Sequence, residues 1–237
     1  MTTTRVETIG SAKSIEMPLD GIVLHGDLSV PANALGLVLF AHGSGSSRLS
    51  PRNRAVAATL HEGRIATLLF DLLTHDEERV DTITRQHRFD IPTLAGRLVA
   101  VTDWVATSSE IARLPVGYFG ASTGAAAALV AAARLPDAVR AVVSRGGRPD
   151  LAGASLDEVR APTLLIVGAA DPEVLELNRL ALARLTGVCA LEVVPGATHL
   201  FEEPGALEQV AGLARRWFER HLAPPDAATR EQRQSGW

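Results

Sequence analysis

The sequence predicts an α/β fold built on a mostly parallel sheet, and two observations support this prediction. From Leu37 onward, short apolar runs alternate with longer segments of helical periodicity, which is the order that produces parallel strands joined by crossover helices. The chain has 237 residues, of which 46% are hydrophobic, and this is enough to fill the core of one such domain. We therefore expect a single domain over residues 1–223.

The elements follow in a regular order. A hairpin is predicted first, because residues 12–18 and 22–30 alternate on either side of an Asp20-Gly21 turn, and it is expected to form an edge of the sheet. Six buried strands are then predicted at residues 37–41, 65–71, 116–121, 141–147, 163–169 and 190–196. Helices are predicted near residues 51–62, 90–109, 123–134, 173–185 and 204–221. Residues 224–237 have almost no apolar periodicity and are expected to form a disordered tail.

Charge and cysteine usage limit the function classes. The 23 basic and 27 acidic residues give a net charge of −4, which argues against a nucleic-acid partner. The single cysteine, Cys189, cannot form an internal disulfide, so a reducing, cytoplasmic location is expected. No apolar signal segment and no apolar run of about 18 residues is present, so neither export nor a membrane partner is expected.

The sequence GASTG at residues 120–124 fits the G-x-S-x-G pattern of a serine nucleophile. It lies between a predicted strand and an alanine-rich helix, where the serine occupies a sharp turn and small neighbours let strand and helix approach closely. A plain structural turn is the alternative. The position favours Ser122 as a nucleophile.

A serine nucleophile needs a general base and a carboxylate that orients it. His199 lies between the last predicted strand and the last helix, where a loop can hold an imidazole above the sheet. Asp171 follows the penultimate strand, so the order is Ser122, Asp171, His199, as in α/β-hydrolases. Asp171 could instead be only the N-cap of the helix that begins near Pro172, and Glu173 is then the nearest substitute.

Acyl transfer also requires backbone donors for a developing oxyanion. The N–H of Thr123, directly after the predicted nucleophile, is one candidate. The glycine-rich loop at residues 40–47 supplies the other, which we assign to Ser44, with His42 supporting the loop. The same loop could be a phosphate cradle, but it lacks the lysine and the third glycine of nucleotide-binding motifs. The cysteine and histidines show no metal-ligand spacing, so we expect neither a metal nor a cofactor.

Taken together, four segments resemble the α/β-hydrolase superfamily, and more closely its dienelactone hydrolase-like branch. They are AHGSGS, GYFGASTGAAAAL, LLIVGAADPEV and PGATHLF, within a likeness that spans residues 20–222. The resemblance implies a mostly parallel, eight-stranded sheet with helices on both faces, and hydrolysis of esters through an acyl-enzyme. It also implies the roles of nucleophile for Ser122, base for His199 and orienting acid for Asp171. Similar sequences can be fused to a phosphoribosyltransferase-like domain, for which we expect no counterpart in this chain.

The chain departs from the family at its nucleophile, because classical dienelactone hydrolases use a cysteine primed by a glutamate. Dienelactone itself is therefore not the expected substrate. Only residues 147–161 separate two predicted strands where a cap domain would be inserted, so an open site for small esters is expected. In the same region Arg145 and Arg148 are candidates for holding a substrate carboxylate, although two solvated arginines are the alternative.

The sequence thus predicts a serine hydrolase that cleaves small carboxylic esters. A non-catalytic scaffold that binds a small ligand is a second possibility, because a fold alone does not fix function. Thioesterase or peptidase chemistry on the same three residues is a third. The charged segment at residues 71–90 is predicted as a loop beside the site or as a solvated face.

Overall fold

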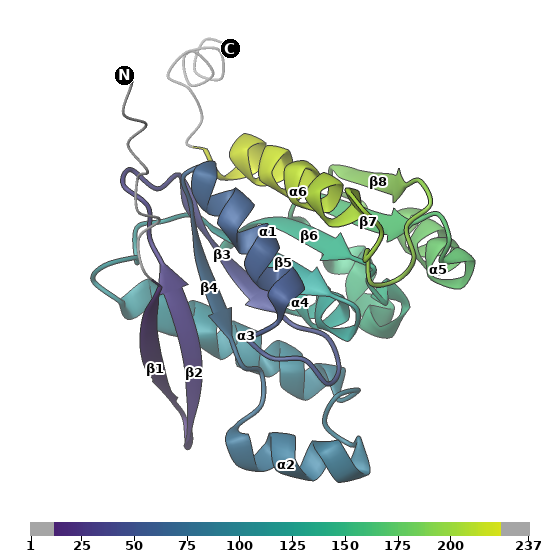
Figure 1. The fold of residues 1–237 in the computed structure, drawn as a ribbon. Helices are drawn as coiled ribbons and strands as arrows, with labels where there is room; N and C mark the ends of the chain where they lie inside the picture. Colours follow the sequence, from purple (N-terminus) through teal and green to yellow (C-terminus); the bar gives the residue numbers. More distant parts are fainter. Residues whose placement is uncertain (1–11, 224–237) are drawn as a thin grey trace, which may run out of the picture.

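The computed structural model describes residues 12–223, and the predicted tail at residues 224–237 lies outside them. Its centre is an eight-stranded sheet with the order β1-β2-β4-β3-β5-β6-β7-β8 (Figure 1). The strands are β1 (Lys13–Leu19), β2 (Ile22–Ser29), β3 (Gly36–Ala41), β4 (Ile65–Phe70), β5 (Val116–Ala121), β6 (Val139–Arg145), β7 (Thr163–Gly168) and β8 (Cys189–Val194). The predicted hairpin forms one edge, where β1 and β2 are antiparallel and β2 pairs antiparallel with β4. The strands from β4 to β8 are mutually parallel.

Helices cover both faces of the sheet, so the predicted α/β fold with crossover connections is confirmed (Figure 1). They are α1 (Pro51–Glu62), α2 (His75–Thr84), α3 (Ile91–Thr107), α4 (Thr123–Arg134), the 3-10 helix η1 (Pro149–Glu158), α5 (Pro172–Leu182) and α6 (Ala206–Leu222). Helices α1 and α6 pack on one face, and α3 and α4 on the other. Among residues 12–223, no helix is both long enough and apolar enough to cross a bilayer.

The core is divided in two by the sheet because successive side chains of a strand point to opposite faces. In β3, Leu39 belongs to the cluster under α3 and α4, while Phe40 belongs to the cluster under α1 and α6. Strands buried on both faces are nearly all apolar, which explains why the sequence shows these strands as continuous apolar runs.

The structure differs from the sequence prediction mainly in the charged segment at residues 71–90. Helix α2 forms there because Thr74 and Glu77 make a capping box, in which the Thr74 hydroxyl accepts from the Glu77 N–H and the Glu77 carboxylate accepts from the Thr74 N–H. Acidic residues fill the first turn of α2, where the helix dipole favours negative charge.

The connection between β6 and β7 is the place where a cap domain would be inserted. It holds only η1, interrupted at Gly153, whose φ of 54° lies in the left-handed region. The prediction of a fold without a cap domain between these strands is therefore confirmed for the described chain.

Candidate active site

Ser122 lies in the sharp turn between β5 and α4. Its φ of 51° and ψ of −121° are unusual for a residue with a side chain and typically cost about 1–3 kcal/mol. The turn is possible because Gly124 has no side chain, since a Cβ there would lie 2.2 Å from the carbonyl oxygen of Ala41. The strained turn projects a half-buried Ser122 side chain beyond the carboxyl end of β5.

Asp171 and His199 meet above the ends of β7 and β8. Asp171 Oδ2 lies 2.7 Å from His199 Nδ1. A carboxylate can only accept, so Nδ1 carries the hydrogen and Nε2 is free to accept a proton. Asp171 occupies the N-cap position of α5, yet its side chain makes no capping hydrogen bond, so the alternative of a pure N-cap is not what the structure contains. Glu173 is exposed on the first turn of α5.

Ser122 and His199 line one cavity of about 200 Å³. Two close approaches bring the loops together around it. A Cβ on Gly43 would lie 3.1 Å from Ser122 Cβ, and one on Gly168 would lie 2.1 Å from the Ala197 carbonyl oxygen. Glycine at these positions therefore lets the loop after β3 and the loop that carries His199 pack against the strand ends.

The two predicted oxyanion donors, Ser44 and Thr123, are neighbours. Ser44 lines the Ser122 cavity, and Thr123 is the first residue of α4, directly after Ser122. In the part of the chain that the structure describes, neither N–H donates to a backbone carbonyl. The side chains of these two residues contact each other, with Ser44 Oγ 3.0 Å from Thr123 Oγ1.

His42 joins the loop after β3 to the segment after β4 by two hydrogen bonds. Its Nδ1 donates to the Gly43 carbonyl over 3.0 Å, and its Nε2 accepts from the Leu72 N–H over 3.0 Å. Both nitrogens are thus used by a neutral ring, and burial, the largest influence, lowers the pKa of His42. His42 is a structural link between two strand ends, in keeping with the supporting role predicted for it.

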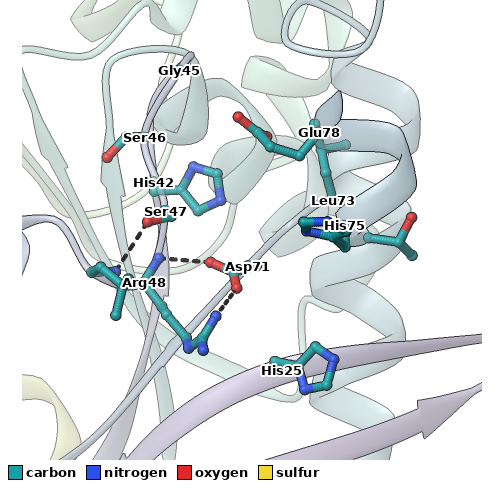
Figure 2. A pocket seen from close by; sticks show the side chains of 12 residues that line it. His25, His42, Gly45, Ser46, Ser47, Arg48, Asp71, Leu73, His75 and Glu78 are labelled. Atoms are coloured by element: carbon teal, nitrogen blue, oxygen red, sulfur yellow. Dashed lines mark hydrogen bonds and ion pairs between the residues drawn. The ribbon is translucent and has the colours of Figure 1, made fainter. Parts of the chain in front are cut away.

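An interaction between Arg48 and Asp71 also joins the loop after β3 to the end of β4 (Figure 2). Asp71 accepts from the Arg48 N–H over 2.8 Å and pairs with the Arg48 guanidinium. The two residues line a polar cavity of about 550 Å³ that also reaches His25 on β2 and His75 on α2. Ser46 lines both this cavity and the one that holds Ser122, so the two are neighbours.

The two arginines predicted to hold an anion have different surroundings. Arg145, at the end of β6, is 8% exposed and lines the Ser122 cavity. Its Nε and Nη1 atoms have no hydrogen-bond partner among the described residues. Burial, with a smaller contribution from the like charge of Arg52, lowers the pKa of Arg145 to about 10, so the guanidinium stays charged at neutral pH.

Arg148 is not brought to the cavity. Its Nε and Nη2 donate to the two carboxylate oxygens of Asp150 over 2.8 and 2.7 Å, so its guanidinium already has a bidentate partner. The structure therefore gives the prediction for Arg148 no support, because the chain turns into η1 directly after this residue. It instead adds Arg52, from the first turn of α1, to the lining of the Ser122 cavity.

Sequence reasoning missed Arg52, Asn53 and the cluster around Asp81. Arg52 and Asn53 reach the site through the packing of α1, for which the sequence has no local signal. The Asp81 cluster depends on α2, and the Thr-x-x-Glu capping box at residues 74–77 is the signal that could have identified this helix. Within residues 12–223, no group of three or more His, Cys, Asp or Glu side chains is arranged to hold a metal ion.

Comparison with known proteins finds a relative of known structure that the match covers over nearly its whole length. The dienelactone hydrolase from Anabaena variabilis ATCC 29413 is 55% identical, with a TM-score of 0.88, and the match covers 89% of this chain and 97% of that one. Est1E from Butyrivibrio proteoclasticus is 20% identical with a TM-score of 0.73 over 87% of this chain and 98% of its own, which shows a shared fold. No family model matches the sequence.

Two curated proteins from Mycobacterium tuberculosis strains CDC 1551 and H37Rv are 61% identical over 213 residues. Both are named "putative phosphoribosyl transferase", and the match covers 90% of this chain but 47% of each relative, so the chain spans about half their length. The relative from Anabaena is matched over nearly its whole length. The chain therefore belongs to the α/β-hydrolase superfamily, in the dienelactone hydrolase-like branch.

Proposed function

We propose that this protein is a serine hydrolase that cleaves small carboxylic esters through an acyl-enzyme. The observation that carries the proposal is the shared cavity, in which Ser122 on its strained turn and the Asp171-bound His199 line one space of about 200 Å³. A nucleophile, a base and an orienting carboxylate on three separate loops are what acyl transfer requires.

The reaction proceeds in two halves. His199 Nε2 takes the proton of the Ser122 hydroxyl while Oγ forms a bond to the ester carbonyl carbon. The carbonyl oxygen becomes an oxyanion that accepts from the N–H groups of Ser44 and Thr123. When the intermediate collapses, the bond to the alcohol oxygen breaks and His199 returns the proton to that oxygen. Water then attacks the acyl-enzyme with His199 again as base, releasing the acid and restoring Ser122.

No step of this reaction uses a cofactor or a metal ion, so the substrate is the sole small-molecule partner in the proposal. The short η1 connection leaves the strand ends without a cap domain there, which favours small or extended esters over long lipids that require a deep apolar tunnel.

Turnover of p-nitrophenyl acetate and butyrate tests the proposal. Replacing Ser122 by alanine removes the nucleophile, so kcat should fall by more than about 10³-fold in a folded protein. Ser14→Ala, an exposed serine on β1, is the matched control and should behave as wild type. Equal esterase activity of Ser122→Ala and wild type would contradict the proposal, and a folded wild type without turnover would favour a ligand-binding scaffold.

The same two proteins distinguish the acyl leaving groups. We expect Ser122-dependent turnover to be fastest for p-nitrophenyl acetate, slower for an acetyl thioester and slowest for an acetyl p-nitroanilide. Ser122-dependent turnover that is fastest for the thioester or the anilide would replace the ester assignment by thioesterase or peptidase chemistry.

We further propose that Arg145 holds an anionic group of the substrate. The support is a buried guanidinium with two unpaired nitrogens at the edge of the Ser122 cavity, beside Arg52 of like charge. A buried donor without a partner typically costs about 1–3 kcal/mol, and a charged one more, so a carboxylate that enters the cavity would relieve this cost.

Arg145→Gln tests this role with p-nitrophenyl hemisuccinate as the anionic ester and p-nitrophenyl butyrate as the neutral one. We expect kcat/KM for the anionic ester to fall about 10- to 100-fold, corresponding to the loss of a charge-assisted hydrogen bond, and the value for the neutral ester to change little. Arg184→Gln, which removes an exposed arginine paired with Asp157, is the control. Normal turnover of the anionic ester by Arg145→Gln would contradict the role, and Arg148→Gln tests the second predicted contact in the same assay.

A further inference from the structure

The side chains of the two predicted oxyanion donors belong to a chain of hydrogen bonds that leads away from the cavity. Ser44 Oγ donates to the carbonyl oxygen of Arg88 over 3.3 Å, so its lone pairs are available to the Thr123 hydroxyl, which lies 3.0 Å away. The direction of donation is therefore Thr123 to Ser44 to Arg88. Residues 79 positions apart, one on each side of the nucleophile, are joined in this way.

The far end of this chain is fixed by a buried carboxylate. Asp81, on α2, is 1% exposed, and its Oδ1 accepts from the backbone N–H groups of His87 and Arg88 over 2.8 and 2.9 Å. Its Oδ2 accepts from Arg88 Nε over 2.7 Å, and Arg88 Nη2 donates to the Asp81 carbonyl over 3.0 Å. Asp81 thus binds both the backbone N–H and the guanidinium of Arg88.

Asp81 is ionised at neutral pH, which makes it an acceptor for the hydrogen bonds from His87 and Arg88. Burial raises the pKa of Asp81, but the hydrogen bonds from Arg88 and His87 and the positive charge of Arg88 together outweigh burial and hold the pKa below its ordinary value. Asp81 is therefore an ionised acceptor at neutral pH. Among the described residues, the hydrogen bonds of this buried carboxylate all come from His87 and Arg88, so Asp81 fixes that loop rather than the sheet.

We propose that Asp81 and Arg88 are positioning residues for the oxyanion hole, acting through the Ser44 and Thr123 hydroxyls to hold the two N–H donors at a fixed separation. The inference rests on the proposed function, because it assigns a role to groups that matter only if an oxyanion forms. Donors are effective only when they are preorganised at the position of the oxyanion, and a misplacement of about 1 Å can cost about 10²-fold in rate.

A positioning role for Asp81 and Arg88 and a role only in stabilising α2 predict different kinetics for their variants. A capping role would affect stability and leave the chemistry of the folded enzyme unchanged. A positioning role predicts a lower kcat with KM nearly unchanged, because the oxyanion forms only in the transition state. It also predicts that removing two links of one chain costs no more than removing one.

The experiment measures kcat and KM for p-nitrophenyl acetate, together with the rate constant for labelling by a fluorophosphonate, in wild type, five test variants and one control variant. Ser44→Ala, Thr123→Val and Asp81→Asn each break one link and should each lower kcat and the labelling rate about tenfold, with KM within about twofold. The double variant Ser44→Ala/Asp81→Asn should match the single variants, and Ser44→Thr, which restores the hydroxyl, should recover most of the wild-type rate.

Glu77→Gln is the matched control, because Glu77 caps α2 and pairs with Arg97 over 2.6 Å, and among the described residues it forms no hydrogen bond or ion pair with Arg88. It should lower the melting temperature while kcat of the folded protein stays close to wild type. Wild-type kcat in Ser44→Ala would overturn the inference, and so would multiplicative losses in the double variant or an equal kcat loss in Glu77→Gln. Because Ser44 is exposed, its variant stays informative even if Asp81→Asn fails to fold.

Failure of the inference is distinguishable from failure of the proposed function. If wild-type turnover depends on Ser122 and Ser44→Ala is unaffected, the serine hydrolase stands and the positioning chain does not. If Ser122→Ala retains turnover, the proposed function fails first, and with it the premise of the chain.

Discussion

At the scale of single residues, the assignment of Asp171 depends on a contact that the sequence leaves open. The residue stands at the start of α5, where aspartate is common as an N-cap, yet its carboxylate is directed to His199 at 2.7 Å. In the proposed mechanism, the same carboxylate holds the imidazole in the tautomer that leaves Nε2 free to accept the Ser122 proton.

Asp171→Asn and Glu173→Gln together test this assignment. In serine proteases the corresponding carboxylate-to-amide change lowers kcat about 10⁴-fold because the wrong tautomer is stabilised, and we expect a loss of similar size for Asp171→Asn. Glu173 is exposed, so Glu173→Gln should keep the wild-type kcat. Steady-state hydrolysis of p-nitrophenyl acetate measures both, and the opposite ranking would make Glu173 the orienting acid.

Other residue-scale features could not be predicted because they depend on tertiary packing. Arg145 and Arg148 are equivalent candidates in the sequence, but the path of η1 gives Arg148 a bidentate partner in Asp150 and leaves Arg145 buried at the cavity. Arg52 has no motif around it and reaches the site only because α1 packs beside it.

At the scale of elements, the close approach of α4 to β3 determines the geometry of the nucleophile turn. Gly124 in α4 allows this approach, whereas Gly96 in α3 has no atom within 4 Å of the position that a Cβ would occupy. Both glycines are helical, so they differ in packing and not in backbone preference.

Alanine substitutions at these two glycines distinguish the effect of packing on the free energy of unfolding from the effect of helix propensity. Gly96→Ala should stabilise the protein by about 0.5–1 kcal/mol, because alanine restricts the unfolded chain more than glycine does. Gly124→Ala should destabilise it by about 1–3 kcal/mol or more, because its Cβ meets the Ala41 carbonyl. Urea unfolding measures both, and stabilisation by Gly124→Ala would show that the approach is not tight.

The elements themselves were predictable where hydrophobic periodicity and position agree. Helices α1 and α4 have the predicted bounds, and the six strands predicted after the hairpin lie where apolar runs occur. The prediction that all six are buried was wrong for β8, because β8 is an edge strand and only Val194 in it is buried. Helix α2 was not predicted because half of its residues are charged and only one, Asp81, is buried, so the helix has almost no apolar stripe. Its formation depends on capping and on the Asp81 contacts rather than on a hydrophobic face.

At the scale of the whole molecule, the parallel sheet explains why the candidate site could be recognised from order alone. The strands β3, β5, β7 and β8 are parallel, so their carboxyl ends lie at the same edge of the sheet, and their loops bring Ser44, Ser122, Asp171 and His199 together there. Which other residues line the candidate site depends on how the loops and helices pack around that edge, and this could not be predicted from the order of the motifs.

The most direct test of the central claim is to find which residue acts as the nucleophile toward a fluorophosphonate. Purified protein is treated with a fluorophosphonate, its intact mass is measured, and the modified peptide is sequenced by tandem mass spectrometry. We predict one adduct per chain on Ser122 and none in Ser122→Ala. A folded wild-type protein that acquires no adduct, or one that is labelled at a different residue, would contradict the account.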